Sequence, residues 1–128
     1  MQFRVQNLTV HKFGGASVKD ADAVRNVESI LQNCLDYPAV VVVSAMGKTT
    51  NKLEQVFSTL VSDGFDKALE ELNEIVVAHQ KVIDALSIEL DLQELFITAL
   101  KKSNLLDDLD AAYDELVASG EDASTKIL

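Results

Sequence analysis

The strongest constraint on the fold is a pair of strand-like segments on either side of one helical segment. Residues 8–13 begin with a short apolar alternation, and Ala39–Val43 is an unbroken run of apolar residues, mostly β-branched. Between them, from about Asp20, apolar residues recur with the 3.6-residue period of a helix. Its apolar stripe consists of Val24, Val27, Ile30, Leu31 and Cys34. This order predicts an α/β fold containing a parallel βαβ unit with a right-handed crossover.

The run Ala39–Val43 shows no alternation of polar and apolar residues. Such a run is typical of a central parallel strand that is covered on both faces. Residues 36–38 end the preceding helix, because the residue before a proline disfavours helix. Residues 1–7 alternate weakly and predict either the start of a strand or a disordered lead. Because two strands rarely form a stable sheet alone, we expect another chain or a longer protein to complete it.

The rest of the chain has almost only helical patterns. The expected helices cover 50–62, 65–86, a segment opened by Asp91 and Glu94, and 105–117. Asp63 and Gly64 stop the first of these. Residues 119–122 are expected to break the last one, and 123–128 resembles a helix that is just beginning. We therefore expect a truncated, helix-rich α/β domain with a small, mostly parallel sheet.

The first strand leads into an elbow that carries a lysine, two glycines and a serine. Gly14 and Gly15 can adopt positive φ and carry no Cβ, so their N–H groups can turn toward an anion at the start of the next helix. Lys12 adds a mobile positive charge. Ser17 followed by Asp20 resembles a capping box. We predict that this elbow holds nucleotide phosphates; the alternative is a tight turn with a surface lysine.

The second strand is followed by a loop rich in hydroxyl groups, residues 44–51. Ligands of open α/β sheets bind beyond the carboxyl ends of the strands, so this loop and the elbow should open on one edge. Ser44 and Thr50 are candidates to face a small anionic substrate; the alternative is that Thr49, Thr50 and Asn51 serve only as a helix N-cap. A Walker A motif is excluded, because Val42 stands where its first glycine should be. No GxGxxG motif follows either strand.

Few other side chains invite a chemical role. Glu121 is either a first-turn acid favoured by a helix dipole or a carboxylate that receives a substrate ammonium group. His79 lies on an apolar stripe and is expected either in the core or at its rim. With only His11 as a second histidine, no metal site is predicted. Cys34 lies on a helix stripe without a basic neighbour and is expected to serve packing rather than nucleophilic chemistry.

Composition excludes several classes of function. Eleven basic and 21 acidic residues give a net charge of −10, which argues against a nucleic-acid partner or an anionic membrane surface. The single cysteine forms no disulfide framework, which fits a cytoplasmic location. The longest apolar run is far too short to cross a bilayer.

Three segments carry a resemblance to a known family, the aspartokinases. Residues 12–18 resemble the family's KFGG(T/A)SV signature, and residues 42–53 resemble VVSAMGxTT(D/N)xL. Residues 114–121 with Ser124 and Thr125 resemble (D/E)xxxSxGExxS, although Asp122 departs from the apolar residue expected there. The segments occur in the family's order and span nearly the whole chain. Glutamate, acetylglutamate and uridylate kinases share the fold but differ at the elbow.

The resemblance implies an amino-acid-kinase-like (carbamate-kinase-like) fold, a three-layer α/β/α arrangement that is incomplete here. Residues 1–128 would be the N-terminal portion of the catalytic domain, without an ACT domain. The implied reaction is ATP-dependent phosphorylation of the β-carboxylate of L-aspartate to 4-phospho-L-aspartate, the first step toward lysine, threonine and methionine. The implied cofactors are ATP and Mg²⁺, and the full-length protein is expected to be a homo-oligomer.

The resemblance also assigns roles to particular residues. Lys12 would be the catalytic, phosphate-contacting lysine. The nucleotide-binding elbow would comprise Lys12, Phe13, Gly14, Gly15 and Ser17. The aspartate side of the site would comprise Ser44, Thr50 and Glu121, with Glu121 meeting the amino group. A carboxylate nucleophile needs no general base, which agrees with the lack of a well-placed histidine.

The resemblance implies that parts of the family's domain lie outside these residues: later strands, the nucleotide-base pocket and an arginine that meets the substrate carboxylate. We therefore expect little or no kinase activity from this chain alone. Two alternatives remain open. One is a non-catalytic module that binds small anions or a partner, and the other is a kinase of the same fold acting on another acid.

Overall fold

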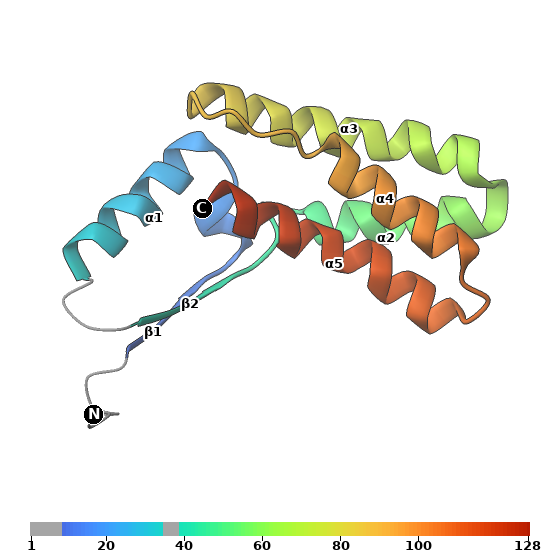
Figure 1. Cartoon of the computed structure of the whole chain (residues 1–128), viewed down its shortest axis with the longest axis horizontal. Coiled ribbons are helices and arrows are strands. Elements are labelled where there is room, and N and C mark those ends of the chain that lie inside the picture. The colour runs from blue at the N-terminus through green and yellow to red at the C-terminus, as the bar shows by residue number, and fades with distance from the viewer. Residues whose placement is uncertain (1–8, 35–38) are drawn as a thin grey trace.

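A computed structural model describes residues 9–34, without the Cys34 side chain, and residues 39–128. The expectations for residues 1–8, for the helix end at 36–38 and for the packing of Cys34 lie outside these described parts. The elements in order are β1 (Thr9–Phe13), the 3₁₀ turn η2 (Gly15–Val18), α1 (Ala21–Cys34), β2 (Ala39–Val43), α2 (Thr49–Asp63), α3 (Phe65–Ala85), α4 (Gln93–Leu105) and α5 (Leu109–Ile127). Strands and α1 lie at one end, and α2 to α5 form a helical bundle at the other (Figure 1).

The βαβ unit is confirmed. β1 and β2 pair in parallel, with Thr9 opposite Ala39 and Phe13 opposite Val43. The strands therefore end level with each other, and the backbone N–H of Ser44 donates to the Phe13 carbonyl at 3.0 Å. Both loops leave the same edge of the sheet, as the parallel arrangement predicts.

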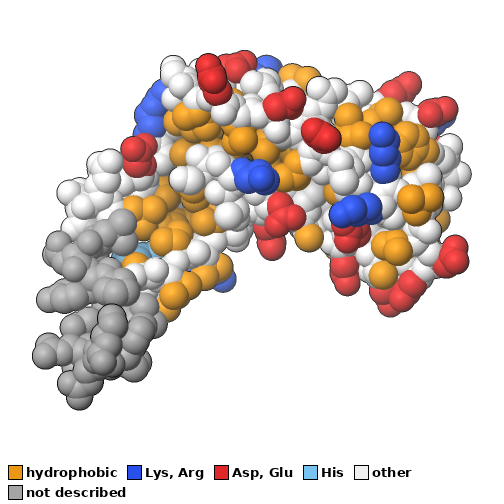
Figure 2. All heavy atoms as spheres, in the orientation of Figure 1, with side chains coloured by type: hydrophobic (Ala, Val, Ile, Leu, Met, Phe, Trp, Pro, Cys, Tyr) orange, Lys and Arg blue, Asp and Glu red, His pale blue; other side chains and the backbone are white. Residues whose placement is uncertain are grey.

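The expectation that β2 is covered on both faces is wrong for this chain. Val40, Val41 and Val42 are 45%, 39% and 44% exposed. β1 is the only strand paired with β2 within residues 9–34 and 39–128. Figure 2 shows hydrophobic side chains reaching the surface beside the strands, while acidic side chains are spread over the helices. The unbroken valine run is thus a surface feature here, because no described element covers it.

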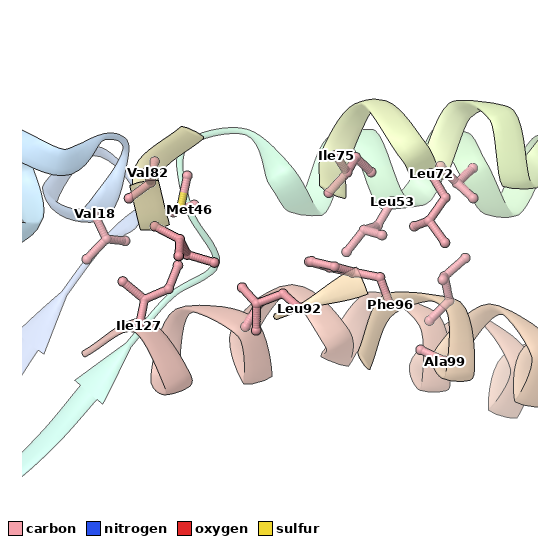
Figure 3. Close-up of a cluster of buried hydrophobic side chains, with 14 of the residues drawn as sticks. Val18, Met46, Leu53, Leu72, Ile75, Val82, Leu92, Phe96, Ala99 and Ile127 are labelled. Carbon is pink, nitrogen blue, oxygen red and sulfur yellow. The ribbon is translucent and has the colours of Figure 1, made fainter. Parts of the chain in front are cut away.

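The core lies between the bundle helices and extends to the strand ends. Its fully buried side chains include Leu53, Leu72, Ile83, Leu92, Phe96, Leu100 and Leu116. Figure 3 shows Leu53, Ile75 and Phe96 pointing toward one another from different helices, and Ile127 close to Val18 and Met46. The helical periodicity in the sequence therefore identified most of the faces that pack together, but Ile30 of the α1 stripe and Val61 of α2 are exposed.

Two helices match their expected bounds within a residue: α2, expected over 50–62, and α3, expected over 65–86. Gly64 separates them with a φ of +100°, a conformation that favours glycine. Asp91 opens α4 as expected, because its carboxylate accepts a hydrogen bond from the Gln93 N–H at 2.9 Å.

The helix expected over 105–117 is present but begins only at Leu109, and the expected break at 119–122 is wrong. Leu105 ends α4, and α5 begins at Leu109, where the Asp108 carboxylate accepts from the Asp110 N–H at 3.0 Å. The helix then continues without interruption to Ile127. Gly120 is buried inside it and serves close packing, so its presence does not mark a helix end.

The capping box is also wrong. The Asp20 carboxylate accepts from the Ala23 N–H at 2.8 Å and so caps α1 itself. Ser17 lies in η2, where its N–H donates to the Gly14 carbonyl at 3.0 Å. No helix of the described residues has the length and apolar character needed to cross a membrane.

Candidate phosphate and substrate site

The glycine elbow is a tight 3₁₀ turn anchored by its neighbours in the sequence. Phe13 at the end of β1 and Val18 at the end of η2 are both buried. Gly14 has a φ of −73° and a ψ of 174°, an extended conformation that any residue can adopt. Positive φ among the described glycines occurs only at Gly47 and Gly64. The expectation of positive φ at Gly14 and Gly15 is therefore wrong.

Gly15 is required for a different reason, the close approach of the second loop. A Cβ at Gly15 would lie 2.6 Å from the Gly47 carbonyl oxygen and 3.1 Å from that of Ala45. The Gly47 N–H donates to the Gly15 carbonyl at 3.0 Å, and Gly47 adopts a φ of +49° to make this contact. The elbow and the second loop are thus joined directly through their backbones.

Lys12 is an exposed residue of β1. It lies opposite Val42 of β2, and Ser44 follows Val42 by two residues. It makes no ion pair with any other residue in the described part of the chain. An exposed ammonium group on a four-carbon stem can follow a charge that moves. The role of Lys12 as a mobile cation at the rim stays a prediction.

The second loop places its hydroxyl groups at the start of α2. Ser44 and Thr50 are half-buried and Thr49 is buried. The N-cap of α2 is Lys48, without a side-chain cap, so the alternative that the threonines serve only as an N-cap is wrong. The first N–H groups of a helix lack intrahelical partners, so the Thr50 hydroxyl lies beside backbone donors suited to an anion.

α5 brings the third segment to the same place. A Cβ at Gly120 would lie 3.0 Å from the Ala45 Cβ and 3.1 Å from the Thr49 Cγ2. The next residue, Glu121, is exposed and lies well inside the length of α5, far from its first turn. The alternative reading of Glu121 as a first-turn acid is therefore wrong.

Sequence reasoning missed the packing roles of Gly47 and Gly120. The sequence could have indicated the role of Gly120, because a glycine within a helical pattern marks either a helix end or a close approach of another segment. Gly47 gave a weaker signal, since a glycine after a strand is common in any loop. The structure thus brings the elbow, the second loop and the Glu121 segment together.

His79 is a core residue, as expected, and takes no part in this site. It is 1% exposed, and its Nδ1 lies 2.8 Å from the Ile75 carbonyl, which can only accept, so Nδ1 carries the proton. Nε2 is buried without a hydrogen-bond partner among the described residues, and the ring packs edge to face on Phe96. Burial lowers the pKa of His79 below 6.5; the hydrogen bond to Ile75 opposes this shift, and the charge of Lys52 adds to it.

A hollow of about 490 Å³ lies between α4 and α5, and no residue of the elbow lines it. Charged side chains of both signs line it, among them Glu94, Lys102, Glu115, Asp122 and Lys126. No group of three or more histidine, cysteine or acidic side chains suited to a metal ion occurs in the described residues.

Comparison with known proteins assigns the class. The amino acid kinase family matches residues 7–128, so the chain belongs to that family. Within it, the chain resembles aspartokinases: it is 34% identical to chloroplastic aspartokinase 2 and 35% identical to chloroplastic aspartokinase 1 of Arabidopsis thaliana. Each match covers 92% of this chain but only 23% and 22% of the relative, so the chain spans less than a quarter of their length.

A solved structure gives the same result for the fold. Escherichia coli aspartokinase III in complex with aspartate and ADP matches with a TM-score of 0.74 and 28% identity, over 94% of this chain and 27% of that one. The expected fold class is confirmed: the chain is a helix-rich, incomplete part of an amino-acid-kinase-like α/β fold with a small parallel sheet.

Proposed function

We propose that this chain supplies the N-terminal part of the active site of an aspartate kinase, which transfers the γ-phosphoryl group of ATP to the β-carboxylate of L-aspartate. The observation that carries the proposal is the meeting of three segments at one sheet edge. The Gly47 N–H donates a hydrogen bond to the Gly15 carbonyl, and Gly120 packs on Ala45 and Thr49. The solved relative that holds aspartate and ADP supports this choice of ligands.

In this proposal the elbow binds the nucleotide. Lys12 neutralises charge on the transferred phosphoryl group, while the backbone of the elbow, with Phe13, Gly14, Gly15 and Ser17, surrounds the phosphates. Phosphoryl transfer depends mainly on positioning and charge stabilisation. N–H groups that are already oriented cost no reorganisation during the transfer, and the backbone bond between Gly47 and Gly15 supports such a fixed geometry.

The second loop and α5 would bind the acceptor. Ser44 and Thr50 donate hydrogen bonds to carboxylate oxygens of aspartate, and Glu121 accepts from its ammonium group. The nucleophile is an ionised carboxylate, so the chain needs no general base. In this proposal Mg²⁺ accompanies the nucleotide and is held mainly by its phosphates.

Several aspects of the whole protein belong to the proposal as well: a place at the start of lysine, threonine and methionine biosynthesis, a homo-oligomeric state and a cytoplasmic location. The chain spans less than a quarter of its curated relatives. We therefore propose that it binds ligands weakly and turns over little or no substrate alone. A coupled ADP-release assay tests this, and turnover near that of a full-length aspartokinase would contradict it.

Calorimetry of the whole chain with ATP–Mg²⁺, and separately with L-aspartate, tests the proposed function. Lys12→Ala is expected to weaken ATP binding about tenfold or more, because a charge-assisted contact to the γ-phosphate contributes about 1.5–3 kcal/mol. Lys67→Ala is the matched control, since Lys67 is also an exposed lysine but lies at the start of α3. Equal ATP affinities of wild type and Lys12→Ala would contradict the phosphate role. Binding of ATP or phosphate without binding of aspartate would instead favour a small-anion module.

A further inference from the structure

Gly120 occupies an unusual position in α5. It is buried in the interior of a helix that continues for seven more residues to Ile127, although glycine is among the least favourable residues there. A Cβ at this position would lie 3.0 Å from the Ala45 Cβ, and 3.1 Å from both the Leu53 Cδ1 and the Thr49 Cγ2. These distances are tighter than most Cβ contacts, so a side chain at residue 120 would require α5 or its neighbours to move by a few tenths of an ångström.

The atoms around Gly120 belong to residues adjacent to the proposed aspartate ligands. Ala45 follows Ser44, Thr49 precedes Thr50, and Gly120 itself precedes Glu121. A displacement at this contact therefore changes the spacing between Glu121 and both hydroxyl groups at once. Binding constellations lose function when their supporting groups shift by about 0.5 Å.

The same contact extends to the phosphate elbow. Ala45 faces Gly120 with its Cβ, and its carbonyl oxygen would be 3.1 Å from a Cβ at Gly15. The Gly47 N–H, two residues further along this loop, donates to the Gly15 carbonyl at 3.0 Å. The loop 44–48 is thus held between two glycines, Gly15 of the elbow and Gly120 of α5.

We propose that Gly120 is a positioning residue: the bare backbone of α5 at this point sets the distance between Glu121 and the hydroxyl groups of the second loop. This inference rests on the proposed aspartate site. Gly120 touches no substrate and acts through Ala45 and Thr49.

The test introduces a methyl group at Gly120 and then removes the methyl group that opposes it. Gly120→Ala is expected to weaken L-aspartate binding about tenfold, because the added methyl group changes the spacing between Glu121 and the hydroxyl groups of Ser44 and Thr50. Ala45→Gly combined with Gly120→Ala should recover affinity to within about threefold of wild type, because the closest and least mobile contact is gone. Ala118→Gly, at an exposed position of α5, controls for helix propensity and should leave aspartate affinity unchanged.

Amide hydrogen exchange gives a readout that needs no ligand. The Gly47 N–H should exchange faster in Gly120→Ala than in wild type and recover its protection in the double variant. Unchanged exchange of this amide in Gly120→Ala, or an aspartate affinity equal to wild type, would overturn the positioning role. Failure of the wild-type chain to bind aspartate would overturn the proposed function, and the exchange experiment would still decide whether Gly120 holds the loop.

Discussion

The helical bundle and the strand pair use similar apolar residues with opposite results. Phe96 and Leu100 in the bundle are fully buried, whereas Val10 in β1 is 66% exposed and Val40 in β2 is 45% exposed. Amphipathic helices can cover one another's apolar faces within a short chain. A parallel sheet needs further layers on both faces, and the described residues do not provide them. Most of the burial that stabilises this chain therefore lies in α2 to α5.

The candidate site lies where these two regions meet. The Arg25 guanidinium donates to the Ala85 carbonyl and joins α1 to the end of α3. Ile127 of α5 packs near Val18 and Met46 at the strand ends (Figure 3). The well-packed bundle thus fixes one side of the site, through α5 and the start of α2. The exposed strand pair carries the other side, including Lys12.

The largest difference between the two regions should appear on truncating apolar side chains. Phe96→Ala is expected to lower the free energy of unfolding by about 3–5 kcal/mol, since it leaves a cavity in the core. Val42→Ala, at a 44% exposed position, should cost less than about 1 kcal/mol. Urea denaturation followed by far-ultraviolet circular dichroism measures both. Equal losses would show that the strand pair is as well covered as the bundle.

A smaller effect is expected at the contact between the elbow and the second loop. Gly15→Ala should destabilise the chain by about 1–3 kcal/mol, because its Cβ would overlap the Gly47 carbonyl at 2.6 Å. Gly14→Ala is the matched control: a Cβ there meets no atom within 4 Å among the described residues. It should change stability by no more than about 0.5 kcal/mol. Similar losses for both variants would contradict the close-approach explanation.

The smallest effect is a pH dependence that belongs to the bundle. The pKa of His79 is lowered on folding, so below its ordinary value of 6.5 the unfolded chain binds more protons than the folded chain. The stability contributed by neutral His79 is therefore complete above pH 6.5 and decreases as the pH falls through the folded pKa, by at most about 1.4 kcal/mol per pH unit. His79→Leu should remove this slope. Unfolding free energies of both proteins between about pH 5 and 8 provide the measurement, and an unchanged slope would exclude His79 as its source.

Much of the local structure could be predicted, because it depends on periodicity and on short-range chemistry. The apolar stripe of α3 identified its buried face, including His79, and Gly64 marked the turn between α2 and α3. The parallel order of β1 and β2 required their loops to share an edge. The continuation of α5 through Gly120 could not be predicted, since only contact with Ala45 and Thr49 explains a glycine there. The exposure of Val41 was also unpredictable, because burial depends on covering layers outside the strand itself.

By itself, the sequence determined the two strands and the presence of the helices, which helix faces are apolar, and that the elbow and the hydroxyl-rich loop lie at one end of the sheet. Only the tertiary structure decided why Gly15, Gly47 and Gly120 must be glycines. Gly47 takes a left-handed conformation to reach Gly15. At Gly15 and Gly120 the requirement is the absence of a Cβ. That absence matters only where the backbone or side chains of a distant segment fill the space, and the chain creates such contacts only when it folds.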